Sequence, residues 1–138
     1  VRKVKTALGG DARGKRVAIW GLSFKPRTDD VRESPALTLI DALLADGAQV
    51  LAHDPEAMEV VRKSYGEKIA LVENAYDACK GADVLVLVTE WREYQNPDFR
   101  RIKKALKAPV VVDGRNIWST YNLKSQGFDY RGIGVRAE

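Results

Sequence analysis

Short apolar runs alternate with longer amphipathic segments along most of this chain, which is typical of an α/β fold. The apolar runs predict buried parallel strands over 16–21, 49–53, 69–72, 84–89, 109–113 and 128–133. The segments between them predict helices over 34–47, 54–66, 74–80, 98–106 and 119–126. Strands linked by crossover helices form a mostly parallel sheet with helices on both faces. We therefore expect a Rossmann-like, doubly wound sheet of five or six strands.

The first predicted helix has the clearest boundary signals. Ser34 is placed to cap its N-terminus, Pro35 suits its first turn, and Gly47 suits its end. Residues 1–15 are polar and basic and contain several glycines, so we interpret them as a linker or the end of a preceding helix, with the domain itself over 16–138. The chain begins with Val1 rather than Met, which indicates processing or a longer parent protein.

Composition narrows the class of protein only a little. The 138 residues are 45% hydrophobic and 30% charged, which fits one globular domain. No apolar run is long enough for a membrane span, and no signal peptide is visible. A single cysteine and a single histidine exclude an internal disulfide framework and a zinc site built from these ligands, and they fit a cytoplasmic protein. The net charge of +4 suits an anionic ligand or partner.

The connection after the first predicted strand, over 21–35, is the most informative segment. Such connections usually have about 2–6 residues, whereas this one is more than twice as long and carries cations, anions and an aromatic ring. Ligands of α/β proteins bind at the carboxyl ends of the strands, where this segment begins. Its Lys and Arg side chains favour a phosphate ligand.

Three more polar segments, 53–55, 89–94 and 113–116, follow predicted strands at the same edge. Together the four segments supply cations and aromatic rings, namely Lys25, Arg32, Arg92, Arg115, Phe24, Trp91 and Tyr94. A nucleoside diphosphate needs this combination, because its phosphates take charge-assisted hydrogen bonds and its base takes a flat apolar surface. The G-x-G-x-x-G fingerprint is absent after the first strand, so we do not expect this domain to hold NAD by itself.

The candidate ligand contacts also have structural interpretations. Lys25 and Arg32 can pair with acidic residues of their own segment, and Phe24 can be a core ring. Asp54 can bind a ribose hydroxyl, as acids after a second strand often do, but Pro55 favours a helix cap.

Three other features favour structural roles. His53 has no nucleophile near it in sequence, and Cys79 has little to lower its pKa, so both are interpreted as packed side chains. The basic helix over 98–106 has an apolar stripe, which directs its cations to solvent rather than to nucleic acid.

Five motifs, in this order, resemble the C-terminal domain of the UDP-glucose/GDP-mannose dehydrogenase family. They are G-L-S-F-K-P at 21–26, T-D-D at 28–30, R-E-S-P at 32–35, T-E-W at 89–91 and V-D-G-R-N at 112–116. The resemblance covers about residues 10–135, and it is greatest to the members that act on UDP-glucose. Enzymes of this family oxidise the sugar alcohol of a nucleotide sugar to a carboxylate, using two NAD+.

The resemblance implies roles for particular residues. Phe24, Lys25 and Arg115 fall where the family contacts the UDP-sugar, and Arg32 falls where an arginine reaches an NAD held by the N-terminal domain of the same enzyme. The resemblance implies no catalytic residue in this chain, so we expect the chain to be inactive alone. It also implies that the complete enzyme is a homo-oligomer. A non-enzymatic, nucleotide-binding regulatory module is the alternative. Neither nucleic acid nor a membrane is an expected partner.

Overall fold

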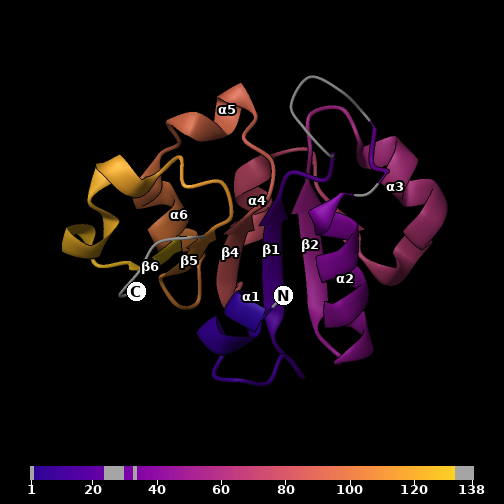
Figure 1. Cartoon of the computed structure of the whole chain (residues 1–138), viewed down its shortest axis with the longest axis horizontal. Coiled ribbons are helices and arrows are strands. Elements are labelled where there is room, and N and C mark those ends of the chain that lie inside the picture. The colour runs from indigo at the N-terminus through magenta and orange to yellow at the C-terminus, as the bar shows by residue number, and fades with distance from the viewer. Residues whose placement is uncertain (1, 24–29, 33, 133–138) are drawn as a thin grey trace.

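The computed structural model describes residues 2–23, 30–32 and 34–132. Six parallel strands form one sheet in the order β3-β2-β1-β4-β5-β6, with β1 and β4 at its centre (Figure 1). The strands are β1 (Arg16–Trp20), β2 (Gln49–His53), β3 (Ala70–Leu71), β4 (Val84–Leu87), β5 (Val110–Asp113) and β6 (Asp129–Gly132). The predicted strands and the doubly wound fold class are confirmed.

Helices cover both faces of the sheet. The helices are α1 (Arg2–Ala7), α2 (Pro35–Ala45), α3 (Met58–Tyr65), α4 (Ala75–Cys79), α5 (Arg92–Gln95) and α6 (Phe99–Ala105), with short 3₁₀ turns η1 (Gly66–Lys68), η2 (Ser119–Tyr121) and η3 (Leu123–Gln126). Val17 and Ile19 of β1 pack in one core with α1, α2 and α3, whereas Ala18 and Trp20 pack in a second core with α4 and α6. Successive strand residues point to opposite faces, so the sheet separates two hydrophobic cores.

The first residues of the chain pack against the sheet. Within and just after α1, Val4 and Leu8 are buried in the same core as α2 and α3, and Ala12 follows them into that core. The Lys3 ammonium donates a hydrogen bond to the carbonyl of Gly132 at 2.6 Å. The segment thus adds an apolar stripe to the sheet face near β4 and β5.

Two helix starts show how side chains set local structure. The predicted cap at Ser34 is confirmed, because its hydroxyl accepts a hydrogen bond from the Ala36 N–H at 3.2 Å. The helix predicted from residue 54 begins only at Met58, since Asp54 Oδ1 holds the N–H groups of Glu56 and Ala57 in a turn, each at 2.8 Å. Helix α5 was not predicted.

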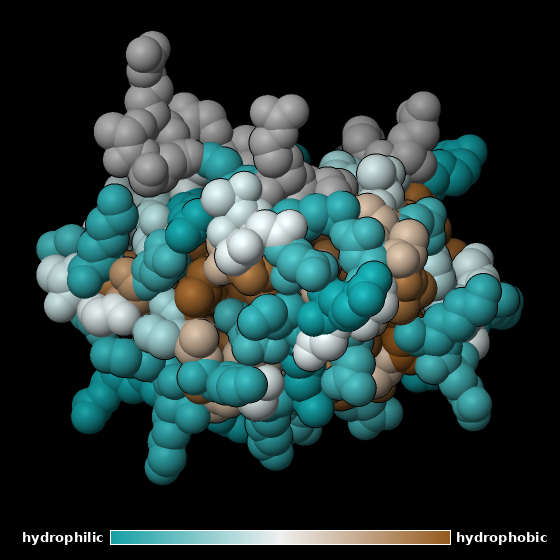
Figure 2. Space-filling model, turned by 90° about the horizontal axis from the view of Figure 1, so that it is seen from below, coloured by the Kyte–Doolittle hydropathy of each residue, from teal (hydrophilic) through white to brown (hydrophobic). Residues whose placement is uncertain are grey.

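Buried polar groups concentrate at one edge of the sheet. The buried polar or charged residues of the described chain are Ser23, Ser34, His53, Asp54, Thr89 and Asp113. All of them end strands or lie in the connections that leave their carboxyl ends. The opposite side, seen from below in Figure 2, is covered mainly by hydrophilic side chains with hydrophobic ones in small areas between them. Within the described chain, polar side chains are therefore buried mainly at the carboxyl edge of the sheet.

Candidate functional site

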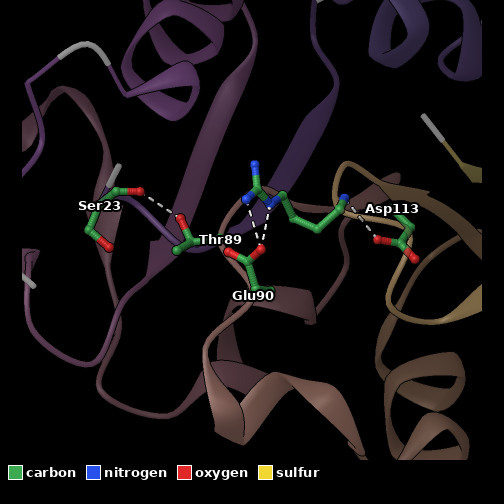
Figure 3. A network of polar contacts seen from close by, with 5 residues as sticks. Ser23, Thr89, Glu90 and Asp113 are labelled. Atoms are coloured by element: carbon green, nitrogen blue, oxygen red, sulfur yellow. Dashed lines mark hydrogen bonds and ion pairs between the residues drawn. The ribbon is translucent and has the colours of Figure 1, made fainter. Parts of the chain in front are cut away.

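The sheet reverses its strand order between β1 and β4, and the connections that leave these two strands meet there. Gly21 follows β1 with a φ of +99°, and a Cβ at this position would lie 2.5 Å from the backbone nitrogen of Thr89. The Thr89 hydroxyl donates a hydrogen bond to the carbonyl of Ser23 at 2.7 Å (Figure 3). Gly21 and Thr89 therefore join the long connection to the end of β4.

A third connection, after β5, is fixed to the same place. The Gly114 N–H donates to the carbonyl of Leu87 at 2.8 Å, and a Cβ on Gly114 would lie 2.6 Å from that oxygen. The fully buried Asp113 accepts hydrogen bonds from the Arg115 N–H at 3.1 Å and the Trp118 N–H at 2.8 Å. Its Oδ2 also accepts one from the Tyr130 hydroxyl. The backbone of Arg115 is thus held firmly at the switch point.

The side chain of Arg115 lies against Glu90, which follows β4. Its Nε and Nη2 both donate to Glu90 Oε2, at 2.9 and 2.7 Å (Figure 3). The arginine side chain is 40% exposed and the glutamate side chain 26%. The predicted sugar-nucleotide contact is therefore partly open to solvent, with a carboxylate beside it. Glu90 entered the predictions only as part of the T-E-W motif, although its place directly after a predicted central strand was the available signal.

Asp54 joins three connections of the carboxyl edge. Its Oδ2 accepts hydrogen bonds from the N–H groups of Leu22 and Ser23, at 2.7 and 3.1 Å, and from the Trp91 indole at 3.1 Å. Together with the two N–H groups bound to Oδ1, these occupy a carboxylate that is fully buried. The structural interpretation of Asp54 fits better than the ribose contact, because no oxygen is left open for a ribose hydroxyl. Asp54 nevertheless caps the turn before α3 and not the helix itself, whose N-cap is Ala57.

Arg32 lies in the connection between β1 and α2, with its guanidinium directed to Asp30. Its Nε and Nη2 donate to the two carboxylate oxygens of Asp30 at 3.0 and 2.8 Å, and its backbone N–H also donates to this carboxylate. The hydrogen bonds and charge of Asp30 raise the pKa of Arg32. The Arg32 side chain is still 88% exposed, so the local ion pair leaves it accessible from outside the domain.

The other predicted site residues have different outcomes. Phe24 and Lys25 lie outside the described residues. The prediction that Trp91 and Tyr94 offer flat surfaces to a base is wrong: they are 8% and 1% exposed. Tyr94 stacks on Trp20 with ring centroids 4.9 Å apart. The sequence correctly predicted that both rings lie at the carboxyl edge, after β4. Their side chains, however, pack into the second core instead of facing a ligand.

The three features interpreted as structural are packed as predicted. His53 is buried against the Tyr94 hydroxyl, 2.5 Å from its Nδ1, and burial lowers the pKa of His53. Burial raises the pKa of Cys79 to about 12, which keeps the thiol protonated. In α6, Phe99 and Ile102 face the core, and the cations of the helix are exposed.

No helix of the described chain combines the length and apolarity that a membrane span needs.

Comparisons with known proteins identify the family of the chain. Residues 18–120 match the model of the UDP-glucose/GDP-mannose dehydrogenase family, UDP binding domain. The chain is 47% identical to a UDP-glucose 6-dehydrogenase of Pseudomonas aeruginosa, over 91% of this chain and 29% of the relative. It is 46% identical to one of Rhizobium meliloti, over 96% of this chain and 30% of the relative. The chain thus spans less than a third of the length of these curated relatives.

Solved structures share the fold of this chain. A UDP-glucose dehydrogenase of Pyrobaculum islandicum superposes with a TM-score of 0.76 at 32% identity, covering 96% of this chain and 27% of that one. An NDP-N-acetyl-D-galactosaminuronic acid dehydrogenase of Methanosarcina mazei gives a TM-score of 0.79 at 29% identity, over 96% and 27%. From the family match over most of the chain and these relatives, the chain belongs to the UDP-glucose/GDP-mannose dehydrogenase family and forms its UDP binding domain.

Proposed function

We propose that this chain holds the UDP part of a nucleotide sugar for an NAD-dependent UDP-sugar 6-dehydrogenase, with UDP-glucose as the substrate. The observation that carries the proposal is the half-exposed guanidinium of Arg115 at the switch point of a UDP binding domain. A guanidinium supplies paired N–H donors to phosphate oxygens. Phe24 and Lys25, in the connection that begins beside Thr89, are proposed as the other contacts of the sugar nucleotide.

Arg32 is proposed to contact NAD from across a cleft between domains. Its high exposure at the edge of the domain fits a contact to a group held elsewhere. The connection after β1 contains the single Gly21 in place of a glycine-rich fingerprint, so most NAD contacts are assigned to another domain. When bound there, NAD+ would accept the hydride removed from the sugar alcohol. Arg32 would supply a positive charge for its phosphates.

The proposed domain organisation follows from the relatives' greater length. Residues 1–15 would connect a preceding NAD-binding domain to the UDP binding domain over 16–138. The catalytic residues would lie in the preceding part, and the complete enzyme would be a homo-oligomer. A cytoplasmic location is proposed because both NAD+ and nucleotide sugars are used there, and because one buried cysteine needs no oxidising compartment.

Titration calorimetry and a dehydrogenase assay test this function in the protein expressed from its complete reading frame. We expect UDP to bind more tightly than uridine, and NAD+ to be reduced when UDP-glucose is added. UDP binding without NAD+ reduction would favour the regulatory module instead. An absence of UDP binding at millimolar ligand would contradict both functions.

A further inference from the structure

Glu90 has no part in the proposed UDP contacts, yet it lies against Arg115, which is one of them. It follows β4 directly after Thr89, at the point where the strand order reverses. Within the described part of the chain, its carboxylate accepts two hydrogen bonds, both from the Arg115 side chain and both at the same oxygen, Oε2. Among the described residues, Glu90 is thus the group that determines where this guanidinium points.

The carboxylate is only half satisfied. Its second oxygen, Oε1, is buried and has no hydrogen-bond partner within the described part of the chain. An unpartnered buried carboxylate oxygen opposes folding, and such groups are rare in native proteins. Departures of this kind are expected mainly at functional sites. Stability of the fold therefore does not account for a glutamate at this position.

The geometry leaves Arg115 free to bind a second anion. Two of its five side-chain N–H donors are used by Glu90, and its backbone N–H is held by Asp113. The remaining N–H donors belong to a side chain that is 40% exposed. An incoming phosphate would meet a guanidinium already oriented, but one whose charge is offset by the adjacent carboxylate.

We propose that Glu90 is a positioning residue that aims Arg115 and sets how strongly the site favours charged ligands. This inference rests on the proposed contact between Arg115 and UDP. The Glu90 carboxylate repels the phosphates that Arg115 attracts, and its effect grows with the charge of the ligand. The pair thus orients the guanidinium while limiting its affinity for the diphosphate that the nucleotide-sugar substrate and its uronate product share.

The test compares uridine, UMP and UDP in the protein expressed from its complete reading frame. In Glu90→Gln the amide oxygen still accepts from Arg115 while the negative charge is lost, so we expect UDP to bind about three- to tenfold more tightly. The gain should be smaller for UMP and absent for uridine. The KM for UDP-glucose should fall by a similar factor, with a smaller change in kcat. The control, Glu93→Gln, removes an equal charge from α5 at an exposed side chain and should change UDP binding much less.

A second variant keeps the proposal testable if the first folds poorly. Glu90→Asp retains the charge but draws it away from Arg115, so UDP should bind more weakly than to the wild-type protein. Wild-type protein that binds no UDP would contradict the proposed function itself. Wild-type binding combined with equal effects of Glu90→Gln on uridine and UDP, or equal effects of the Glu90 and Glu93 variants, would overturn the role of Glu90.

Discussion

The carboxyl edge of the sheet has two polar regions that differ in burial and in purpose. The inner region, with Asp54 and Asp113, is fully buried, and its oxygens are filled by N–H and O–H donors of the protein. The outer region, with Arg32 and Arg115, is exposed and is held by one acidic neighbour each. The inner region therefore fixes the connections, while the outer one leaves its guanidinium groups exposed, as the proposed ligand contacts require.

The difference shows that a charged side chain at this edge is not by itself evidence of a ligand contact. Asp54 lies where an acid of this fold class often meets a ribose, yet its hydrogen bonds all go to the protein. Exposure and unused donors separate the two regions better than residue type does. Substitutions should divide in the same way, with stability lost from the inner region and binding lost from the outer one.

The largest effect is expected for Asp54→Ala. It would leave several buried N–H groups of three connections without an acceptor, at a cost of at least about 3 kcal/mol in the free energy of unfolding. Urea denaturation measures this loss. Asp129→Ala, which removes an exposed carboxylate paired with Arg131, is the control and should change stability by less than about 1 kcal/mol. Similar losses in both variants would remove the distinction between the regions.

Gly21→Ala is expected to have the next largest effect. The new Cβ would lie 2.5 Å from Thr89 atoms, so the connection after β1 must separate from β4, at a cost of about 2–4 kcal/mol. Gly10→Ala provides a matched control, because Gly10 has a φ of +98° but no atom within 4 Å of the added Cβ. It should lose only about 1 kcal/mol from backbone strain. Equal losses would mean that the close approach to Thr89 is unimportant.

Arg115→Ala should separate binding from stability. Loss of hydrogen bonds from a charged donor is expected to weaken UDP binding by about 1.5–3 kcal/mol, or roughly 10- to 150-fold. The free energy of unfolding should change by less than about 1 kcal/mol, since the ion pair with Glu90 is partly exposed. Calorimetry and urea denaturation on the same variant check both values. Unchanged UDP affinity would exclude Arg115 from the site.

Arg32→Ala should leave stability within about 0.5 kcal/mol of the wild-type value, because its pair with Asp30 is exposed and local. In the complete protein it should raise the KM for NAD+ and leave UDP affinity unchanged. Steady-state kinetics with each ligand varied in turn give this comparison. A larger effect on UDP than on NAD+ would place Arg32 with Arg115 instead.

The smallest effect concerns His53 in the inner region. Burial lowers the pKa of His53 below the ordinary value of 6.5, and this effect exceeds the opposite one of the nearby negative charges of Glu93 and Asp54, which raise the pKa. The unfolded chain therefore takes up a proton first as the pH falls, so stability should decline below about pH 6.5. Urea denaturation from pH 7.5 to 5.5 tests this, and His53→Gln should flatten the decline. A wild-type stability that is constant across this range would contradict the burial argument.

The sequence predicted the sheet well because its signals are local. Buried strands appear as short apolar runs, and Ser34 with Pro35 marks a helix start through hydrogen bonds to its own first turn. The start of α3 was misplaced because Asp54 caps a turn before the helix. Whether Trp91 and Tyr94 face solvent or the core depends on packing with Trp20 and Asp54, far away in the sequence.

The sequence alone determined the fold class, the family and the edge at which a ligand is expected. Apolar periodicity and motif order are properties of contiguous residues, and strand carboxyl ends share one edge in any parallel sheet. Only the tertiary structure decided which polar groups at that edge are buried and which are exposed. It joined Gly21 to Thr89, filled the oxygens of Asp54, and set Glu90 against Arg115. These contacts connect residues distant in sequence, and their burial is set by the whole packed edge.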